Sequence, residues 1–168
     1  MSTVAIDDGA RTTTAERFVA AMSTVCTPVA VVTAMAGARP HGTTVSAFAS
    51  LSLAPPMVVV ALDRASALLP LVLETRRFGV NLLTSEQAGL ADAFARKGAA
   101  KFDGVAWHLV AGMPRLSGPG GWLACDLHDT VDGGDHVVLL GAVADAVPSV
   151  SAPLTYSGRR FGTHLALP

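Results

Sequence analysis

Apolar and β-branched residues cluster in short runs along most of the chain, and this pattern predicts more strands than helices. Three such runs predict strands over Val29–Met35, Met57–Leu62 and Phe78–Leu83. Turn residues at Ala36–Pro40 predict that the first strand returns as an antiparallel partner over His41–Ser46. The last third of the chain alternates apolar segments with turns rich in glycine and proline, and predicts strands over residues 106–110, 122–129, 137–147 and 159–165.

Local capping signals predict a small number of helices. A Thr-x-x-Glu capping box at Thr13 predicts a helix that ends near Ser23. A second box at Thr84 predicts another, with Phe94 on its apolar side, and Ser66 is expected to cap a short third helix. No regular βαβ alternation is present, so a mainly β fold is expected, an antiparallel barrel with a few peripheral helices. One domain is expected over residues 13–168, after a flexible arm at 1–12.

The charge balance argues against nucleic acid or an anionic membrane surface as a partner. The chain has 12 basic and 13 acidic residues, and Lys97 and Lys101 are its only lysines. The longest apolar run, residues 57–62, is too short to span a membrane, and the polar N-terminus does not resemble a secretory signal, which favours a cytoplasmic location. Because 51% of residues are hydrophobic and only 15% charged, a homo-oligomer is expected. Cys26 and Cys125 lack metal-ligand spacing and are predicted to be reduced and buried.

Six potential metal ligands fall within eleven residues, between Asp126 and His136. Their spacing matches no usual ligand pattern, and Asp132–Asp135 has the composition of a hairpin tip, so no metal site is predicted. His136 follows this tip at the start of a strand. It is either a functional side chain or an ordinary surface histidine.

The stretch from His41 to Leu62 has the composition of a ligand site. Its hydroxyl side chains lie beside small residues, Gly42, Ala47 and Ala49, that would let a flat ligand approach the backbone. A serine-rich connection between strands is the alternative interpretation. Lys101, in a loop bounded by glycines, suits a phosphate or is a solvated surface lysine. Asn81 either satisfies an internal backbone group or faces the same pocket as Ser66.

Taken together, six segments resemble the flavin reductase domain family, and their order and approximate spacing agree from about Phe18 to Phe161. They are HGTTVSAFASLSLAPPMVVVAL at 41–62, FGVNLLTSEQAGLADAFA at 78–95, KFDG at 101–104, GMPRLSGPGGWLACDL at 112–127, GGDHVVLLGAV at 133–143 and PLTYSGRRFG at 153–162. The Gly-Asp-His tripeptide at Gly134–His136 is the most specific of these features.

The resemblance implies a split antiparallel β-barrel that binds FAD or FMN and forms a homodimer. It also implies an NAD(P)H:flavin oxidoreductase, in which NADH reduces a flavin that then leaves for a separate flavin-dependent monooxygenase. Hydride transfer is chemistry of the two coenzymes, so the protein need only position them. The alternative is a flavin carrier or storage protein that does not turn over NADH.

The same resemblance implies roles for individual residues. His136 would lie on the nicotinamide side as the catalytic residue, with Tyr156 and Arg160 as further candidates there. Residues expected to line the isoalloxazine and ribityl groups are Thr43, Thr44, Val45, Ser46, Ala47 and Ser50. Ser66 and Ala67 would lie near the phosphate, and Lys101 and Phe102 would close over the flavin. Ala65 and Ala67 stand where relatives often have lysines, which changes how the phosphate is held.

Overall fold

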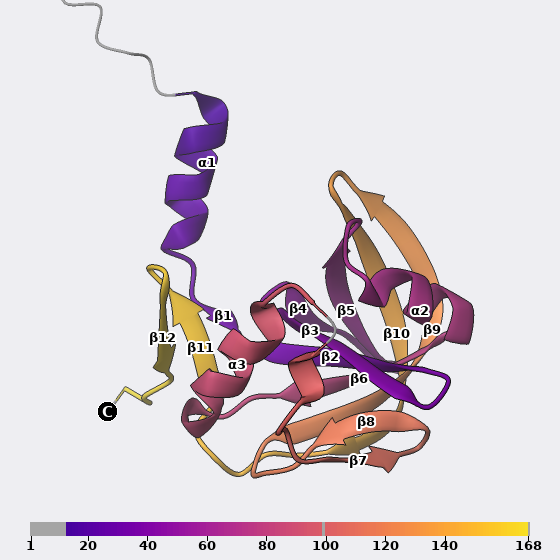
Figure 1. Cartoon of the computed structure of the whole chain (residues 1–168). Coiled ribbons are helices and arrows are strands. Elements are labelled where there is room, and N and C mark those ends of the chain that lie inside the picture. The colour runs from indigo at the N-terminus through magenta and orange to yellow at the C-terminus, as the bar shows by residue number, and fades with distance from the viewer. Residues whose placement is uncertain (1–12, 99, 168) are drawn as a thin grey trace, which may run out of the picture.

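The computed structural model describes residues 13–98 and 100–167, and its centre is a seven-stranded antiparallel sheet (Figure 1). The arm predicted over residues 1–12 lies outside the described residues. From one edge to the other, the strands are β3 (Arg39–Val45), β2 (Ala30–Ala36), β6 (Arg77–Leu82), β9 (Gly121–Gly133), β10 (His136–Val147), β5 (Pro56–Asp63) and β4 (Phe48–Leu53). The predicted mainly β, antiparallel architecture is confirmed.

The two edges of this sheet are joined by only two residues, Ser46 and Ala47, which connect β3 directly to β4. The Ala47 carbonyl accepts a hydrogen bond of 2.9 Å from the Ala61 N–H, which ties the link to β5. The sheet therefore curls into a barrel that is split between β3 and β4. Sequence analysis missed β4, because serine-rich Phe48–Leu53 buries none of its side chains.

Two smaller sheets flank the barrel. The first contains β1 (Thr27–Pro28), β11 (Leu154–Ser157) and β12 (Arg160–Thr163), and the second is the hairpin of β7 (Trp107–Val110) and β8 (Met113–Leu116). The strand predicted over 159–165 is thus β12, paired with β11, which the sequence did not predict. Short strands of two to four residues give too weak an alternating pattern to be recognised.

Within the described residues, three helices form near the predicted positions, together with two short 3₁₀ turns, but only the Thr13 capping box acts as predicted. The helices are α1 (Thr14–Ser23), α2 (Leu68–Thr75) and α3 (Ala88–Ala95), and the turns are η1 (Ser85–Gln87) and η2 (Ala100–Phe102). The Thr84 box opens a 3₁₀ turn ahead of its helix, and the N-cap of the helix predicted to start at Ser66 is Ala67, which makes no side-chain capping bond. The Thr13 hydroxyl accepts from the Glu16 N–H at 3.2 Å, and the Thr13 N–H donates to the Glu16 carboxylate at 2.7 Å. No described helix is long and apolar enough to cross a membrane. Helix α1 buries none of its side chains and projects away from the barrel (Figure 1).

The barrel interior is filled mainly by valine, leucine and phenylalanine side chains from β2, β5, β6 and β10, covered by α2. Trp122 is fully buried. Cys125 is also buried, and burial with the nearby Asp126 carboxylate raises the pKa of its thiol to about 12. The prediction for Cys26 is wrong: this side chain is exposed, because it lies in the short connection between α1 and the barrel.

Candidate functional site

A cavity of about 180 Å³ lies at the split of the barrel, and we call it the central cavity. Its walls come from the end of β3 with the β3–β4 link, the end of β5, and the start of β10. The lining residues are Thr43, Thr44, Val45, Ser46, Ala47, Ala61, Leu62, Asp63, Ser66 and His136. Five of the six residues predicted to line a flavin ring are therefore brought together with the predicted catalytic histidine.

Thr44 lines the central cavity, and its side chain also forms a structural hydrogen bond. Its hydroxyl donates a hydrogen bond of 2.7 Å to the Ala91 carbonyl, which joins β3 to α3. Since that proton is committed, the Thr44 oxygen remains available only as an acceptor. Ser66 also bonds locally, because its hydroxyl oxygen accepts from the Leu68 N–H at 3.3 Å.

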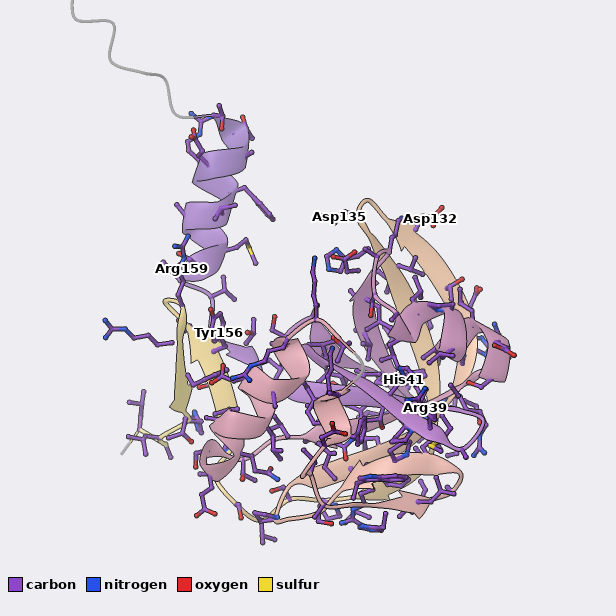
Figure 2. All side chains as sticks on the ribbon, viewed as in Figure 1. Arg39, His41, Asp132, Asp135, Tyr156 and Arg159 are labelled. Atoms are coloured by element: carbon purple, nitrogen blue, oxygen red, sulfur yellow. The ribbon has the colours of Figure 1, made fainter. Side chains whose placement is uncertain are left out.

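His136 enters the central cavity from the hairpin between β9 and β10. The turn residues are Gly134 and Asp135, and Gly134 has a left-handed φ of 73°, which fits a two-residue turn. The His136 Nδ1 lies 2.8 Å from the Asp135 carboxylate, and the side chain is 41% exposed. The hydrogen bond from His136 lowers the pKa of Asp135, and the electrostatic attraction of His136 lowers it further. Figure 2 shows Asp135 and Asp132 at the outer end of this hairpin.

Ion pairs and local contacts use several carboxylates between Asp126 and His136. Asp126 pairs with Arg77 at 3.0 Å, and Asp132 pairs with Arg64 at 2.6 Å. The Arg64 Nε also donates to the Gly134 carbonyl at 2.8 Å, so this arginine fixes the hairpin tip to the β5–α2 loop. Within the described part of the chain, no three His, Cys, Asp or Glu side chains are grouped as a metal would require.

A second cavity of about 410 Å³ opens beside the first, between α2 and the loop that follows α3, and we call it the loop cavity. Its lining residues are Thr43, Asp63, Ala65, Ser66, Ala67, Ala95, Arg96, Lys97, Gly98 and Lys101. Thr43, Asp63 and Ser66 line both cavities, so the two are neighbours. Sequence analysis did not identify Arg96 or Lys97, whose only signal was their proximity to Lys101.

Lys101 is held in place by backbone carbonyls. Its Nζ donates to the Gly42 carbonyl at 3.1 Å and to the Phe94 carbonyl at 2.9 Å. Burial lowers the pKa of this lysine. Two of the three ammonium N–H donors are thereby used, and one remains for a ligand.

Phe102 anchors the same loop through an aromatic cluster. Its ring meets Phe94 at a centroid distance of 4.8 Å and Trp107 at 5.8 Å, both edge-on. Phe102 and Lys101 line a small cavity of about 40 Å³ together with Gly42, Thr43 and Ser66. The loop is therefore packed against the barrel next to both larger cavities.

The space left by Gly42 is used for packing, which corrects the expectation that it admits a flat ligand. A Cβ built on Gly42 would lie 2.9 Å from the buried Phe94 ring and 3.3 Å from Thr33 Cγ2. Gly42 thus allows α3 to pack closely on β3. Its effect on a ligand is indirect, through the Phe94 and Lys101 contacts.

A third cavity, of about 480 Å³, lies between the end of β3, α3 and the β11–β12 hairpin, and we call it the hairpin cavity. Its lining residues are Val29, Thr44, Val45, Ser46, Ala91, Asp92, Ala95, Tyr156, Arg159 and Phe161. Tyr156 is therefore next to the central cavity's β3 wall. Figure 2 shows Tyr156 and Arg159 on the β11–β12 hairpin, below α1.

The turn of the β11–β12 hairpin distinguishes the two adjacent arginines by position. Ser157 pairs with Arg160, and the two turn residues, Gly158 and Arg159, both have left-handed φ values. This turn directs Arg159 to the hairpin cavity, whereas Arg160 lines none of the cavities described. The sequence Ser-Gly-Arg-Arg does not show which arginine lies at the tip of the hairpin, because that depends on how β11 pairs with β12.

Two other predicted ligand residues lie outside these cavities. Ser50 is exposed on the edge strand β4, paired with Val58. Asn81 is buried: its amide nitrogen donates to the Val31 carbonyl at 3.2 Å, and its oxygen accepts from the Leu116 N–H at 2.8 Å. Of the two interpretations of Asn81, the structure supports satisfaction of internal backbone groups, which joins β6 to β8.

A family model and similar proteins agree with the resemblance seen in the sequence. The model of the flavin reductase like domain matches residues 22–164. The chain is 38% identical over 134 residues to the reductase component of 4-nitrophenol 4-monooxygenase/4-nitrocatechol 2-monooxygenase from Rhodococcus opacus, which covers 80% of this chain and 72% of that protein. It is 38% identical over 157 residues to a flavin reductase (NADPH) of Lentzea aerocolonigenes, which covers 91% of each.

A solved structure has a similar fold. The NADH:FAD oxidoreductase SgcE6 of Streptomyces globisporus C-1027, in complex with NAD and FAD fragments, superposes with a TM-score of 0.84 at 30% identity. The match covers 91% of this chain and 93% of that chain.

Proposed function

Because this chain belongs to the flavin reductase like domain family, we propose that it is an NAD(P)H:flavin oxidoreductase that supplies reduced flavin to a separate flavin-dependent monooxygenase. The observation that carries the proposal is the central cavity, where Thr43–Ala47 and His136 line one space although Ala47 and His136 are 89 positions apart in the sequence. The Rhodococcus opacus relative bears the name of a monooxygenase reductase component, which supports the proposed partner.

The residues of the central cavity fit a flavin. Ser46 and Ala47 are exposed and small, so a flat ring can lie against the β3–β4 link. Strand β3 is an edge strand, and N–H groups on its free side have no strand partner. These donors would hold the polar edge of the ring, while Thr43 and Ser66 would meet the ribityl chain and first phosphate beside Lys101.

The reaction we propose is hydride transfer from the nicotinamide to the flavin, which is chemistry that the two coenzymes supply. The chain's own contribution is position and electrostatics. Lys101 would favour the negative charge of reduced flavin through its remaining N–H donor. His136 would orient the nicotinamide at the opening of the central cavity. Asp135 holds the His136 ring through Nδ1, so it serves as a positioning residue.

We propose NADH as the reductant and a diffusing flavin as the substrate. The SgcE6 structure, solved with NAD and FAD fragments, supports this choice, whereas the Lentzea aerocolonigenes relative is named for NADPH. Tyr156 and Arg159 of the hairpin cavity are candidates for contact with the remainder of the dinucleotide. A cytoplasmic location accompanies this proposal, since metabolism produces NADH there.

A homodimer is also part of the proposal. Phe18 and Met22 on α1 are 63% and 48% exposed, and Leu53 on the edge strand β4 is 90% exposed. Apolar side chains gathered on an unpartnered helix and on a sheet edge are typical of subunit contacts. Light scattering at micromolar concentration should give a mass near 34 kDa, twice the 17.1 kDa of one chain. A mass of one chain would contradict the dimer.

The deciding experiment is NADH oxidation by the purified protein with FAD, FMN or no added flavin. Turnover that depends on added flavin is the expected result, with NADPH tested in parallel. Flavin binding without turnover would refute the reductase and favour the carrier alternative.

A further inference from the structure

The loop cavity is larger than a single phosphate requires. Its volume is about 410 Å³, compared with about 180 Å³ for the central cavity. A phosphate group with five heavy atoms would use a small share of that space. The volume lies within the roughly 300–1,000 Å³ that small-molecule sites occupy. The cavity can therefore hold a further group beyond the first phosphate of a flavin.

The loop cavity is also the most basic place described in a chain with a net charge of −1. Both lysines of the chain, Lys97 and Lys101, line it together with Arg96. The acidic lining residue is Asp63, and its carboxylate already accepts a hydrogen bond of 2.7 Å from the Ala65 N–H. The cavity therefore carries excess positive charge and suits an anion.

All three cations come from one wall. The α2 wall presents Ala65 and Ala67, which carry no charge, and the loop after α3 presents Arg96, Lys97 and Lys101. Any ionic contact to a ligand phosphate must therefore come from the α3 side. This arrangement assigns the loop, and not the entry to α2, as the anchor.

The three cations lie at different depths relative to the central cavity. Lys101 lines the small cavity with Thr43 and Ser66, and these two residues line the central cavity as well. Arg96 and Lys97 line only the loop cavity. A ligand that extends from the central cavity would meet Lys101 first, and Arg96 and Lys97 after it.

We propose that Arg96 and Lys97 bind the second phosphate and the adenosine of FAD, so that this chain selects FAD over FMN. The inference rests on the proposed function, since it places the flavin ring in the central cavity. FMN ends at the first phosphate and reaches only Lys101. FAD continues into the loop cavity, where the arginine can bond the diphosphate or stack on adenine.

The test measures the binding of riboflavin, FMN and FAD in the absence of NADH. The change in flavin fluorescence reports the binding. The double variant Arg96→Ala/Lys97→Ala should raise the Kd for FAD at least tenfold, raise the Kd for FMN less than threefold, and leave riboflavin unchanged. The control Arg17→Ala/Arg115→Ala also removes two positive charges, and neither residue lines a cavity described above. It should leave all three constants unchanged.

Arg96→Gln/Lys97→Gln keeps polar side chains of similar length and guards against a folding defect, and Arg96→Lys/Lys97→Arg should restore FAD binding. Equal increases for FMN and FAD, or tight FAD binding that persists in both neutral variants, would overturn the inference. Failure of the proposed function looks different. Wild-type protein would then bind FAD in preference to FMN without oxidising NADH, whereas turnover with equal KM for both flavins would refute only the FAD selection.

Discussion

Replacing Gly42 by alanine should loosen the contact between β3 and α3 beside the site. The new methyl group would lie 2.9 Å from Phe94 Cδ1 and Cε1, and 3.3 Å from Thr33 Cγ2. Phe94 is fully buried and packs edge-on against Phe102, so a shift of its ring would disturb this packing. Overpacking of this kind costs about 1–3 kcal/mol. The folding equilibrium constant should therefore fall by roughly 5- to 150-fold.

The free energy of unfolding can be measured by urea denaturation, at one protein concentration because a dimer would make it concentration-dependent. The matched control is Gly89→Ala, the same change on α3, where a Cβ meets nothing within 4 Å. That variant should be about 0.5–1 kcal/mol more stable than the wild type, because alanine favours the helix.

Adding Phe94→Leu to Gly42→Ala would make room for the methyl group. The double variant should therefore lose less free energy of unfolding than the sum of the losses in the two single variants. If Gly42→Ala is as stable as Gly89→Ala, α3 does not pack on β3 as closely as described. Because the Gly42 carbonyl accepts from Lys101, the Kd for flavin should also rise in Gly42→Ala and stay unchanged in Gly89→Ala.

Other expectations concern the cavities and the thiols. His136→Ala should lower NADH oxidation at least tenfold while flavin Kd changes little, and an unchanged rate would remove this side chain from the mechanism. Ala47→Leu should raise the flavin Kd at least tenfold by filling the central cavity, so wild-type affinity would show that the ring lies elsewhere. A thiol reagent at pH 8 should label Cys26 in the folded protein and Cys125 only after unfolding. The raised pKa of Cys125 keeps its thiol protonated in the folded state, whereas the unfolded chain loses this proton above about pH 9. The free energy of unfolding should therefore fall as the pH rises above about 9.

The features that the sequence predicted well are those decided within a few residues. The Thr13 capping box, the β-branched run of β2 and the turn before His136 depend on local chemistry, and each forms where expected. The motif residues from Thr43 to Ala47, identified through the family resemblance, line one cavity with His136.

The questions that the sequence left open are those that long-range pairing decides. Asn81 lies in an apolar strand, and only the position of β8 shows that it bonds the Leu116 N–H. Arg159 and Arg160 are adjacent and chemically identical, so the register of the β11–β12 hairpin alone selects between them. Arg96 and Lys97 resemble an ordinary solvated helix end until α2 is placed opposite them.

The location of both lysines in the loop after α3 has a practical consequence for anyone who handles this protein. Reagents that modify primary amines will react, apart from the terminal amine, only at Lys97 and Lys101. Coupling to a biosensor surface through amines, or labelling with a succinimidyl dye, would therefore obstruct the loop cavity in most molecules. A protein attached in this way would bind flavin poorly although its fold is intact. Attachment through the exposed Cys26 thiol avoids the problem, because Cys26 lines none of the cavities described here.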